Sequence, residues 1–480
     1  MNNRTLDIWL EGTFAGKLHR GKGTEVEFVY DQDYLSLPDP TPLSISMPGE
    51  REGYGPAVVI PWLENLLPDD PVTRQGWAAH FGTTQTDAFT LLGYMGADAP
   101  GAVQVVPEGS EPNLVGQQIP LSDAQIARKV EGLIESPKDW IGESESFDKW
   151  SLGGSQSKFA LALVEGKWYE PSGRAASTHI VKPGMQISVL TNAETQALEY
   201  VTMRTARLAG LSVADVELKE FAGMPTFVTQ RYDRVIHSNG SVARVHQEDM
   251  CQALGVSPRL KYEEHGGPGI AQIAEILEAR SYRPVQDKEL FAEAIAFNLL
   301  VAGTDSHAKN YSLIHVGRNA VFAPLYDLVS AHAIYYPKSA LMRASAPMTH
   351  GNTRRYNYVN ADSLALTADD LRLSRDRFTD ILVAVARRLS DAATQAIEEL
   401  PPNLRTDKIA SLSRSFAASG RHFIARAADV KTSHVSQSSH VGTVRNRLGR
   451  EVPVKVWVPG HWRNGEWVFG YERGWPRVRS

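Results

Sequence analysis

Apolar and polar residues alternate at the start of the chain, a pattern that is typical of β-strands. Leu6, Ile8 and Leu10 fall on one face, and Gly12 marks the turn to a second strand. Further strands are predicted at residues 26–30, 42–47 and 101–107. Helical spacing of apolar residues predicts helices at residues 58–67, 72–81 and 87–92. Residues 1–107 are therefore expected to form one small α+β module.

The middle of the chain alternates between helices and strands. Ser122 and Gln125 form a capping-box pair at the start of a predicted helix. Strands are predicted at residues 159–164, 177–183 and 226–234, and a helix at residues 192–208. The strand at 226–234 is expected to lead into a hinge between two lobes.

Longer helical patterns dominate the C-terminal half. Leu290, Phe297 and Val301 mark a helix that is predicted to end at Gly303. Short strands at 311–315 and 320–323 and helical regions at 367–400 and 405–428 follow. The expected fold is a two-lobed, protein-kinase-like α/β fold with an N-terminal α+β module and a mostly helical C-terminal lobe. The predicted domain ranges are 1–107, 108–254, 255–430 and 431–480.

Composition adds limits to this picture. The 480 residues are 22% charged and 42% hydrophobic, which is ordinary for a globular protein of two or three domains. A net charge of −5 argues against a protein that binds nucleic acid over its whole surface. The single cysteine, Cys251, excludes a disulfide framework and a cysteine-based zinc cluster. Because no membrane span or signal peptide is predicted, a cytoplasmic protein is expected.

The stretch from Gly303 to Asn310 carries the strongest candidate chemistry. Asn310 follows Asp305 by five positions, and Asp327 comes after the two short strands. Protein kinases use this order: the first Asp accepts the proton of the acceptor hydroxyl, while the Asn and the second Asp hold magnesium against the nucleotide phosphates. Asn310 and Asp327 are expected at adjacent strand ends, close enough to share one cation.

Two other segments fit a nucleotide site. Residues 149–158 form a small-residue loop before a strand, and the backbone amides of such a loop can approach phosphate oxygens closely. Lys182 ends the next strand, and Glu199 on the following helix is a candidate ion-pair partner for it. The ordinary alternatives are a hairpin turn, a solvent-exposed edge lysine and an exposed helical glutamate.

Other chemistries fit the central stretch less well. Asp305 and His307 have the spacing of a metal-binding pair, but the sequence has no His-x-x-x-His and no second Asp-x-His to complete a hydrolytic metal site. A serine hydrolase would need a Gly-x-Ser-x-Gly elbow after a strand, and the sequence has none. A plain polar turn does not explain why Lys309, Asn310 and Asp327 occur together.

The last fifty residues differ from the rest of the chain. Residues 431–441 are rich in Ser and His and are predicted to be a linker, and Asn464-Gly465 is a hairpin signal between two strands. From residue 431 onward, nine Arg or Lys stand against three Glu. This tail is either a hairpin that covers a sheet edge or a contact surface for a partner or for nucleic acid.

A set of motifs resembles the HipA family of serine/threonine-kinase toxins. The resemblance covers roughly residues 1–428, and its specificity lies in the combination of motifs. The motifs lie at residues 62–69, 101–103, 151–161, 178–182, 230–234, 247–252, 261–269, 304–310 and 326–331.

The resemblance implies a role for each matching residue. Asp305 would be the catalytic base, and Asn310 and Asp327 would hold Mg²⁺. Gln230 to Tyr232 would meet the adenine of ATP. The implied ATP-binding residues are Gly153, Gly154, Ser155, Gln156, Ser157, Lys158, Lys182, Gln230, Arg231, Tyr232, Gln247, His307, Ala308, Lys309, Asn310, Tyr326 and Asp327.

Ser151 matches the serine whose autophosphorylation in trans ejects the phosphate loop in the family. A phosphate there adds nearly two negative charges beside the nucleotide phosphates, so repulsion gives the switch a physical basis. The loop of this chain carries Ser155 and Ser157 where the family usually has Ala and Glu, which makes them alternative sites. The hinge begins with Gln230 instead of Glu, and Phe-Gly does not follow Asp327.

The expected function is that of an ATP-dependent serine/threonine-protein kinase, the toxin of a type II toxin–antitoxin pair. The resemblance implies an aminoacyl-tRNA synthetase as the target, whose phosphorylation arrests growth. It also implies a small helix-turn-helix antitoxin, HipB-like, that carries most of the binding to operator DNA. Two alternatives stay open: a nucleotide-sensing co-repressor subunit without phosphate transfer, and a kinase of a small molecule or lipid.

Overall fold

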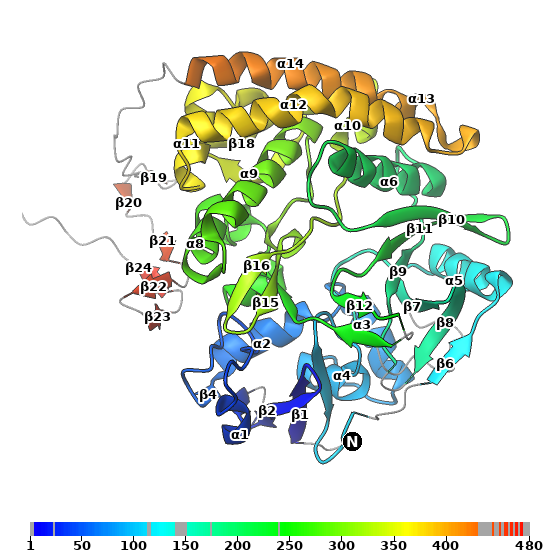
Figure 1. Ribbon diagram of the computed structural model, residues 1–480, viewed down its shortest axis with the longest axis vertical. Coiled ribbons are helices and arrows are strands. Elements are labelled where there is room, and N and C mark those ends of the chain that lie inside the picture. The colour runs from blue at the N-terminus through cyan, green and yellow to red at the C-terminus, as the bar shows by residue number, and fades with distance from the viewer. Residues whose placement is uncertain are drawn as a thin grey trace, which may run out of the picture.

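The computed structural model is a mixed α/β protein with the N-terminal module at one end and long helices at the other (Figure 1), which confirms the predicted fold class. The structure describes residues 4–22, 25–112, 117–139, 151–172, 175–238, 241–430 and six short strands between residues 444 and 473. Within these ranges, no helix combines the length and the apolar character that a membrane crossing requires.

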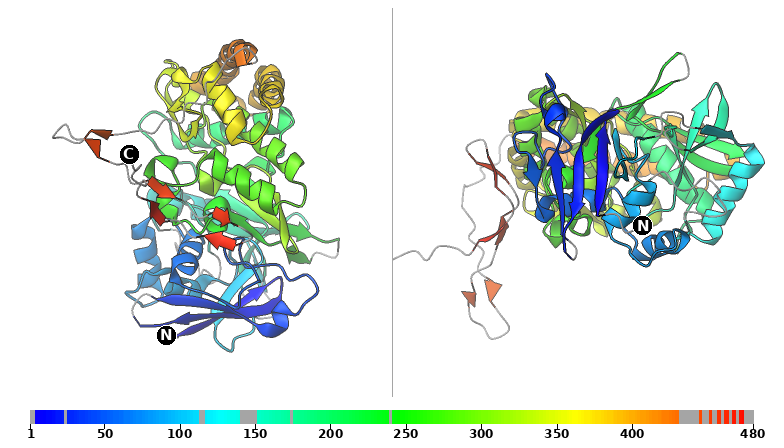
Figure 2. Two further views of the ribbon diagram at one scale, coloured as in Figure 1. Left: turned by 90° about the vertical axis from the view of Figure 1, so that its left-hand side faces the viewer. Right: turned by 90° about the horizontal axis from the view of Figure 1, so that it is seen from below.

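A five-stranded antiparallel sheet is the framework of the N-terminal module (Figure 2, right). Its strand order is β4-β3-β2-β1-β5, so the last strand of the module pairs with the first. The strands are β1 (Thr5–Leu10), β2 (Thr13–Arg20), β3 (Val26–Tyr30), β4 (Gly53–Tyr54) and β5 (Val103–Pro107). The helices are α1 (Gln32–Leu35), α2 (Pro56–Asn65), α3 (Pro71–His80) and α4 (Ala88–Met95). The three predicted helices and all but one of the predicted strands of this module are confirmed.

The predicted strand at residues 42–47 is wrong. The segment is a turn with a bridge between Ser44 and Met47. Its apolar side chains are buried, which is why the sequence pattern resembles a strand. Its polar groups bond outside the module: Ser44 Oγ and the Ile45 amide donate to the two oxygens of Glu248, at 2.5 and 2.7 Å. The segment therefore attaches the module to the rest of the molecule.

A six-stranded sheet of order β10-β11-β9-β7-β8-β6 carries the predicted phosphate loop and hinge. Lys182 on β9 pairs with Phe227 on β11, and Gln230 pairs with His179, so the lysine strand and the hinge strand are neighbours. The strands are β6 (Gln117–Pro120), β7 (Phe159–Val164), β8 (Lys167–Ser172), β9 (His179–Lys182), β10 (Val216–Phe221) and β11 (Met224–Gln230). The helices are α5 (Asp123–Glu135), which begins with the predicted capping box, and α6 (Asn192–Leu208).

The C-terminal lobe is mostly helical. The helical region predicted at 367–400 is two helices, α11 (Ala361–Asp370) and α12 (Arg375–Glu398), because Ser374 caps the second and Arg372 takes a left-handed conformation between them. The other helices are α7 (Met250–Ala253), α8 (Ile270–Arg280), α9 (Pro284–Val301), α10 (Ala331–Ile334), α13 (Asp407–Ala410) and α14 (Leu412–Val430). The strands are β12 (Arg234–Ile236), β13 (Val242–Arg244), β14 (Gln247–Asp249), β15 (Ser312–Val316), β16 (Asn319–Phe322), β17 (Ser345–His350) and β18 (Thr353–Arg355).

The end of α9 positions the central stretch. Ala302, and not Gly303, takes the left-handed conformation that ends the helix, with φ at 52°. Gly303 is required by space instead, because a Cβ atom there would lie 2.2 Å from Oδ1 of the buried Asn298. The prediction that the helix ends here is confirmed, while the residue that ends it is a different one.

Two apolar cores fill the molecule. One joins the N-terminal module to the six-stranded sheet and includes Trp62, Phe159 and Val181. The other fills the helical lobe and includes Phe297 and Leu382. The domain ranges 1–107, 108–254, 255–430 and 431–480 stay a prediction.

The predicted hairpin in the tail is present as β22 (His461–Arg463) paired with β23 (Glu466–Val468). The predicted linker at 431–441 lies outside the described residues. The remaining tail strands are β19 (Val444–Arg445), β20 (Glu451–Val452), β21 (Val456–Val458) and β24 (Tyr471–Arg473).

Candidate active site

A cavity of about 450 Å³ lies between the N-terminal module, the six-stranded sheet and the helical lobe. Its volume is in the usual range for small-molecule sites. Each of the three parts contributes charged side chains: Asp69 from the module, Lys158 and Lys182 from the sheet, and Asp305 and Asp327 from the lobe. The structure thus brings together residues that lie far apart in the sequence.

Nearly all of the residues predicted for ATP binding line this cavity. The exceptions are Ser157 and Ala308, which are buried and do not line it. Ala308 packs in the apolar core of the helical lobe, so its side chain stabilises the lobe. The structure offers no direct contact between these two side chains and a ligand in the cavity.

Lys182 is the centre of a buried ion-pair triad. Its Nζ lies 2.7 Å from Glu199 Oε1 and also donates to Asp327 Oδ1. Burial alone lowers the pKa of Lys182, but Asp327 and Glu199 outweigh it and hold the pKa above its ordinary value. Burial raises the pKa of Asp327 too, but Lys182 and Lys158 reverse the effect and keep this carboxyl ionised. The predicted pair of Lys182 with Glu199 is confirmed.

The loop from Gly303 to Asn310 is held by two hydrogen bonds to one backbone oxygen. The carbonyl oxygen of Asp305 accepts hydrogen bonds from the His307 amide at 2.9 Å and from Asn310 Nδ2 at 2.6 Å. These bonds fix Asp305 at the mouth of the cavity, with 51% of its side chain exposed. Desolvation in the cavity and the nearby Asp327 raise the pKa of Asp305. A carboxylate of raised basicity is suited to accept a proton.

Tyr262 and His307 flank the Asp305 carboxylate. The Tyr262 hydroxyl donates to Asp305 Oδ1 at 2.9 Å, and His307 Nε2 lies 3.5 Å from the same oxygen. The two rings meet edge to face, with centroids 4.9 Å apart. Burial lowers the pKa of His307 to about 3, so its imidazole is neutral near pH 7. The site therefore holds one ionisable base, Asp305, beside the neutral rings of Tyr262 and His307.

The predicted phosphate loop is fixed to the N-terminal module. Asp69 N donates to Gly154 O at 3.0 Å, and Lys158 Nζ donates to Gly153 O at 2.9 Å. A Cβ atom on Gly153 would lie 2.7 Å from the Asn65 carbonyl oxygen, so only glycine fits here. Burial and the nearby Lys182 lower the pKa of Lys158 to about 8. Gly153 and Gly154 thus lie between the buried Lys158 and the N-terminal module.

Ser151, at the start of this loop, is fully buried. Its amide donates to the Asp98 carbonyl oxygen at 3.2 Å, while its hydroxyl has no hydrogen-bond partner among the described residues. Ser157 is buried as well, whereas Ser155 is exposed. In this conformation only Ser155 of the three loop serines is accessible to another molecule.

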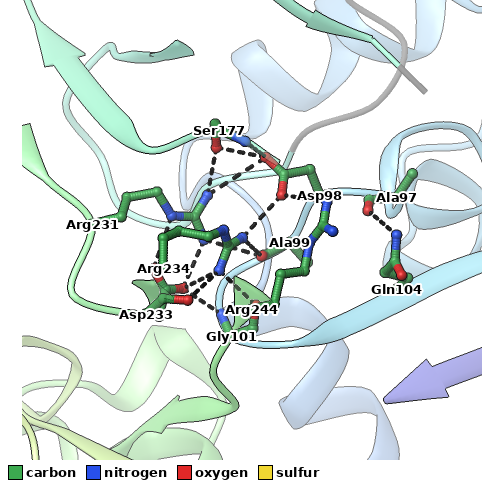
Figure 3. A network of polar contacts seen from close by, with 10 residues as sticks. All are labelled: Ala97, Asp98, Ala99, Gly101, Gln104, Ser177, Arg231, Asp233, Arg234 and Arg244. Atoms are coloured by element: carbon green, nitrogen blue, oxygen red, sulfur yellow. Dashed lines mark hydrogen bonds and ion pairs between the residues drawn. The ribbon is translucent and has the colours of Figure 1, made fainter. Parts of the chain in front are cut away.

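The hinge strand continues into a buried charge cluster, which Figure 3 shows. The Arg231 guanidinium donates to both oxygens of Asp233, at 2.9 and 2.8 Å, and to Ser177 Oγ at 2.9 Å. Arg234 bonds Asp98 Oδ1 at 2.9 Å, and Arg244 bonds the same oxygen at 3.1 Å. The guanidinium of Arg231 is therefore occupied by hydrogen bonds within this cluster. A nucleotide in the cavity can contact only the backbone and the aliphatic part of Arg231.

Aromatic residues form the wall next to the hinge. The rings of Tyr232 and Tyr326 lie 5.9 Å apart, and the Tyr232 hydroxyl donates to Gln247 Oε1 at 2.7 Å. The Tyr326 hydroxyl donates to the Lys309 carbonyl oxygen at 2.6 Å. Gln230 is exposed at the rim. Flat apolar walls with a few fixed polar groups suit a planar ring system such as adenine.

The donor set for a cation consists of Asn310 and Asp327, which line the same cavity. The described residues contain no group of three or more His, Cys, Asp or Glu that could hold a metal. A carboxylate that stays ionised and an amide nevertheless fit Mg²⁺, which takes most of its oxygen ligands from water and phosphate. Asp327 takes a left-handed backbone conformation, with φ at 58°, an arrangement that is found at functional sites.

Comparisons with known proteins identify the family of this chain. The model of the HipA N-terminal domain matches residues 6–106, and the model of the HipA-like C-terminal domain matches residues 150–393. The chain belongs to the HipA family. This membership confirms the family that the sequence motifs indicate, and it places the chain among kinases, the predicted enzyme class.

Individual relatives are similar over most of their length. The Sinorhizobium fredii protein Y4mE is 34% identical over 85% of this chain and 98% of its own. The serine/threonine-protein kinase toxin HipA of Shewanella oneidensis is 30% identical over 75% of this chain and 82% of its own. A solved complex of Shewanella oneidensis HipA, HipB and operator DNA gives a TM-score of 0.77 at 26% identity, covering 90% of this chain and 100% of that one.

The sequence of this HipA-family chain indicates no role for Asp69, Asp249 and Lys261, which line the cavity, or for Tyr262, which bonds Asp305. Each lies in a motif of the resemblance, so the signal was present. Burial raises the pKa of Asp249 to about 7, although Lys309 and a backbone hydrogen bond to Gln252 oppose the change. The sequence gives no sign that Asp69 pairs with Lys309, since Lys309 lies 240 positions after it.

Proposed function

We propose that this chain is an ATP-dependent serine/threonine-protein kinase with Asp305 as its catalytic base. The observation that carries the proposal is the triad in which Lys182 contacts both Glu199 and Asp327. In protein kinases the lysine–glutamate ion pair and the metal-binding aspartate must both be in place before transfer. Here these side chains share one cavity with Asp305.

The proposed reaction is transfer of the γ-phosphoryl group of ATP to a protein hydroxyl. The acceptor oxygen bonds to the γ-phosphorus while the bond from that phosphorus to the β–γ bridging oxygen breaks, which releases ADP. The acceptor proton passes to Asp305. Lys182 and the amides of the loop at 153–158 would hold the phosphates. Asn310 and Asp327 would hold Mg²⁺, which neutralises phosphate charge when it is bound.

Self-phosphorylation on Ser151 is the proposed means of inactivation. The burial of this serine supports the idea, because its hydroxyl reaches another molecule only if the loop leaves its place. After modification, returning to the buried position would desolvate a phosphate dianion, which is costly. The exposed Ser155 and the buried Ser157 are the other candidates on the loop.

The proposed biological role is that of the toxin in a type II toxin–antitoxin pair in the cytoplasm. The solved Shewanella oneidensis complex holds HipA together with HipB and operator DNA. By this likeness, a HipB-like helix-turn-helix antitoxin would bind this chain and carry it to operator DNA. A translation component such as an aminoacyl-tRNA synthetase is the proposed target.

Phosphosite mapping by mass spectrometry tests the kinase assignment. The chain is incubated with ATP, with and without Mg²⁺, beside Asp305→Asn. We expect phosphate on a loop serine only when Mg²⁺ is present, and a rate at least about 100-fold lower in the variant, which is the usual size of a general-base contribution. The variant should bind ATP within threefold of the unmodified chain by calorimetry.

Two results would contradict this assignment. Equal phosphate incorporation in Asp305→Asn would remove Asp305 from the base role. ATP binding without phosphate on any residue of the unmodified chain would favour the nucleotide-sensing co-repressor or a non-protein acceptor.

A further inference from the structure

The N-terminal module places one carboxylate inside the cavity. Asp69 lies in the turn between α2 and α3, and its side chain is 17% exposed. Arg74 secures this turn, because its Nε donates to the Pro68 carbonyl oxygen at 2.6 Å. None of the predicted catalytic or nucleotide-binding roles uses Asp69.

Two lysines of the helical lobe converge on this carboxylate. Lys309 Nζ donates to Asp69 Oδ1 at 2.9 Å, and Lys261 Nζ donates to Asp69 Oδ2 at 2.8 Å. Both lysine side chains are largely buried, at 6% and 15% exposure. Burial raises the pKa of Asp69, but Lys309 and Lys261 outweigh it and lower the pKa to about 2. Each ammonium is thus held by one oxygen of an ionised carboxylate.

The position of this cluster connects it to the reacting phosphate. Lys309 directly precedes Asn310 in the catalytic loop, and its Nζ lies 3.6 Å from the place where a Cβ of Gly153 would be. The carbonyl oxygen of Lys261 accepts a hydrogen bond from the Ala308 amide at 3.2 Å, so the second lysine is tied to the same loop. The amide of Asp69 also bonds the phosphate loop, at Gly154 O. Asp69 therefore contacts both loops between which the phosphates are proposed to lie.

We propose that Asp69 is a positioning residue for phosphoryl transfer, which holds Lys309 and Lys261 at the phosphate loop so that their ammonium groups face the transferring phosphate. The inference rests on the proposed kinase function. The three charges sum to +1, and without Asp69 two neighbouring buried ammonium groups would repel each other and leave these positions. The N-terminal module is in this way a component of the active site.

Three variants test this inference in the full chain. Asp69→Asn removes the charge at constant shape, Asp69→Glu keeps it, and Glu64→Gln changes a nearby module carboxylate that bonds Ser257 and neither lysine. Initial rates of self-phosphorylation, ATP affinity by calorimetry and melting temperature are measured for each.

We expect Asp69→Asn to lower the transfer rate at saturating ATP at least tenfold, while ATP affinity stays within threefold because the cavity becomes more positive. Asp69→Glu should recover part of the rate, and Glu64→Gln should transfer at the unmodified rate. Lys309→Met combined with Asp69→Asn should be no more than threefold slower than Lys309→Met alone, because without Lys309 no second ammonium group is left to repel Lys261.

Several outcomes overturn the inference. An unchanged rate in Asp69→Asn, a fully additive loss in the double variant, or a parallel loss of ATP binding and melting temperature would each show that Asp69 does not act through the lysines. In those cases the unmodified chain still transfers phosphate and the kinase assignment stands. If the unmodified chain transfers no phosphate at all, the kinase assignment fails and this inference fails with it.

Discussion

Tyr262 and His307 both lie close to Oδ1 of Asp305. The proton affinity of this carboxylate therefore depends on each of these two side chains. The hydroxyl of Tyr262 stabilises the ionised form of Asp305, while desolvation and Asp327 oppose ionisation. The balance matters because the base has to be ionised before it accepts a proton.

Tyr262→Phe should raise the pKa of Asp305 further, because it removes a hydrogen bond to the ionised form. The acid limb of the rate profile for phosphate transfer should then move to higher pH. The rate at neutral pH should fall by no more than about tenfold, since one hydrogen bond contributes roughly 0.5–1.5 kcal/mol. Rates between pH 5 and 9 check this.

The matched control for this variant is Tyr282→Phe, which changes a tyrosine that is 71% exposed and does not line the cavity. Its rate profile should coincide with that of the unmodified chain. A Tyr262→Phe profile that also coincides would show that the hydroxyl does not influence Asp305.

Single residues differ in how well the sequence predicts them. The kinase pattern of Asp305, Asn310 and Asp327 could be found because each residue has a fixed place in a short motif. Asp69 could not, because a carboxylate has no sequence signal for a lysine 240 positions away. Arg231 is an intermediate case, since it lines the cavity as its motif indicated while its guanidinium bonds Asp233.

At the scale of elements, the phosphate loop depends on one close contact with the end of α2. Gly153 lies against the Asn65 carbonyl oxygen, where a Cβ atom would approach to 2.7 Å. A backbone atom cannot rotate out of the way as a side chain can, so the loop itself has to move. Such a movement would displace the amides that are proposed to hold phosphate.

Gly153→Ala should therefore weaken ATP binding about tenfold, which corresponds to roughly 1.4 kcal/mol. The control is the same substitution at Gly132 in α5, where the added Cβ would meet no described atom within 4 Å beyond its chain neighbours and the backbone of its own helix. Gly132→Ala should leave ATP affinity unchanged and raise stability by roughly 0.5–1 kcal/mol, because alanine favours helices. Calorimetry and thermal unfolding measure both. Equal ATP affinities in the two variants would contradict this account of the loop.

Elements were predictable where local rules act alone. The helix at 192–208 was predicted with its observed bounds, and in the structure a capping box at Thr191 starts it. The turn at 42–47 was mistaken for a strand because its apolar side chains are buried like those of a strand, while its hydrogen bonds go to Glu248, about 200 residues later. The break between α11 and α12 was missed because apolar periodicity continues through it.

At the scale of the whole molecule, the buried charge cluster joins the N-terminal module to the hinge. Asp98 comes from the module, and its side chain meets three arginines that follow 133 or more positions later. Burial raises the pKa of Asp98, but Arg234, Arg244 and Arg231 reverse the effect and hold the pKa far below its ordinary value. The ion pairs therefore favour the assembled molecule at all but strongly acidic pH.

Asp98→Asn should destabilise the protein by about 3–5 kcal/mol, the usual loss when a buried charge loses its partner. Asp391→Asn, on an exposed face of α12, is the matched control and should unfold like the unmodified chain. Urea unfolding measures the difference. A loss below about 1 kcal/mol would show that the arginines find other partners.

The sequence separation between Asp69 and Lys309 also determines how long synthesis must continue before the two residues can meet. A ribosome that adds 5–20 residues per second needs roughly 10 to 50 seconds to make the 240 residues between the two. The module leaves the ribosome first, and no complete cleft exists until the helical lobe has folded onto it. A kinase built in this way has no complete active site while it is being made, so the proposed antitoxin would have that interval in which to bind the nascent chain.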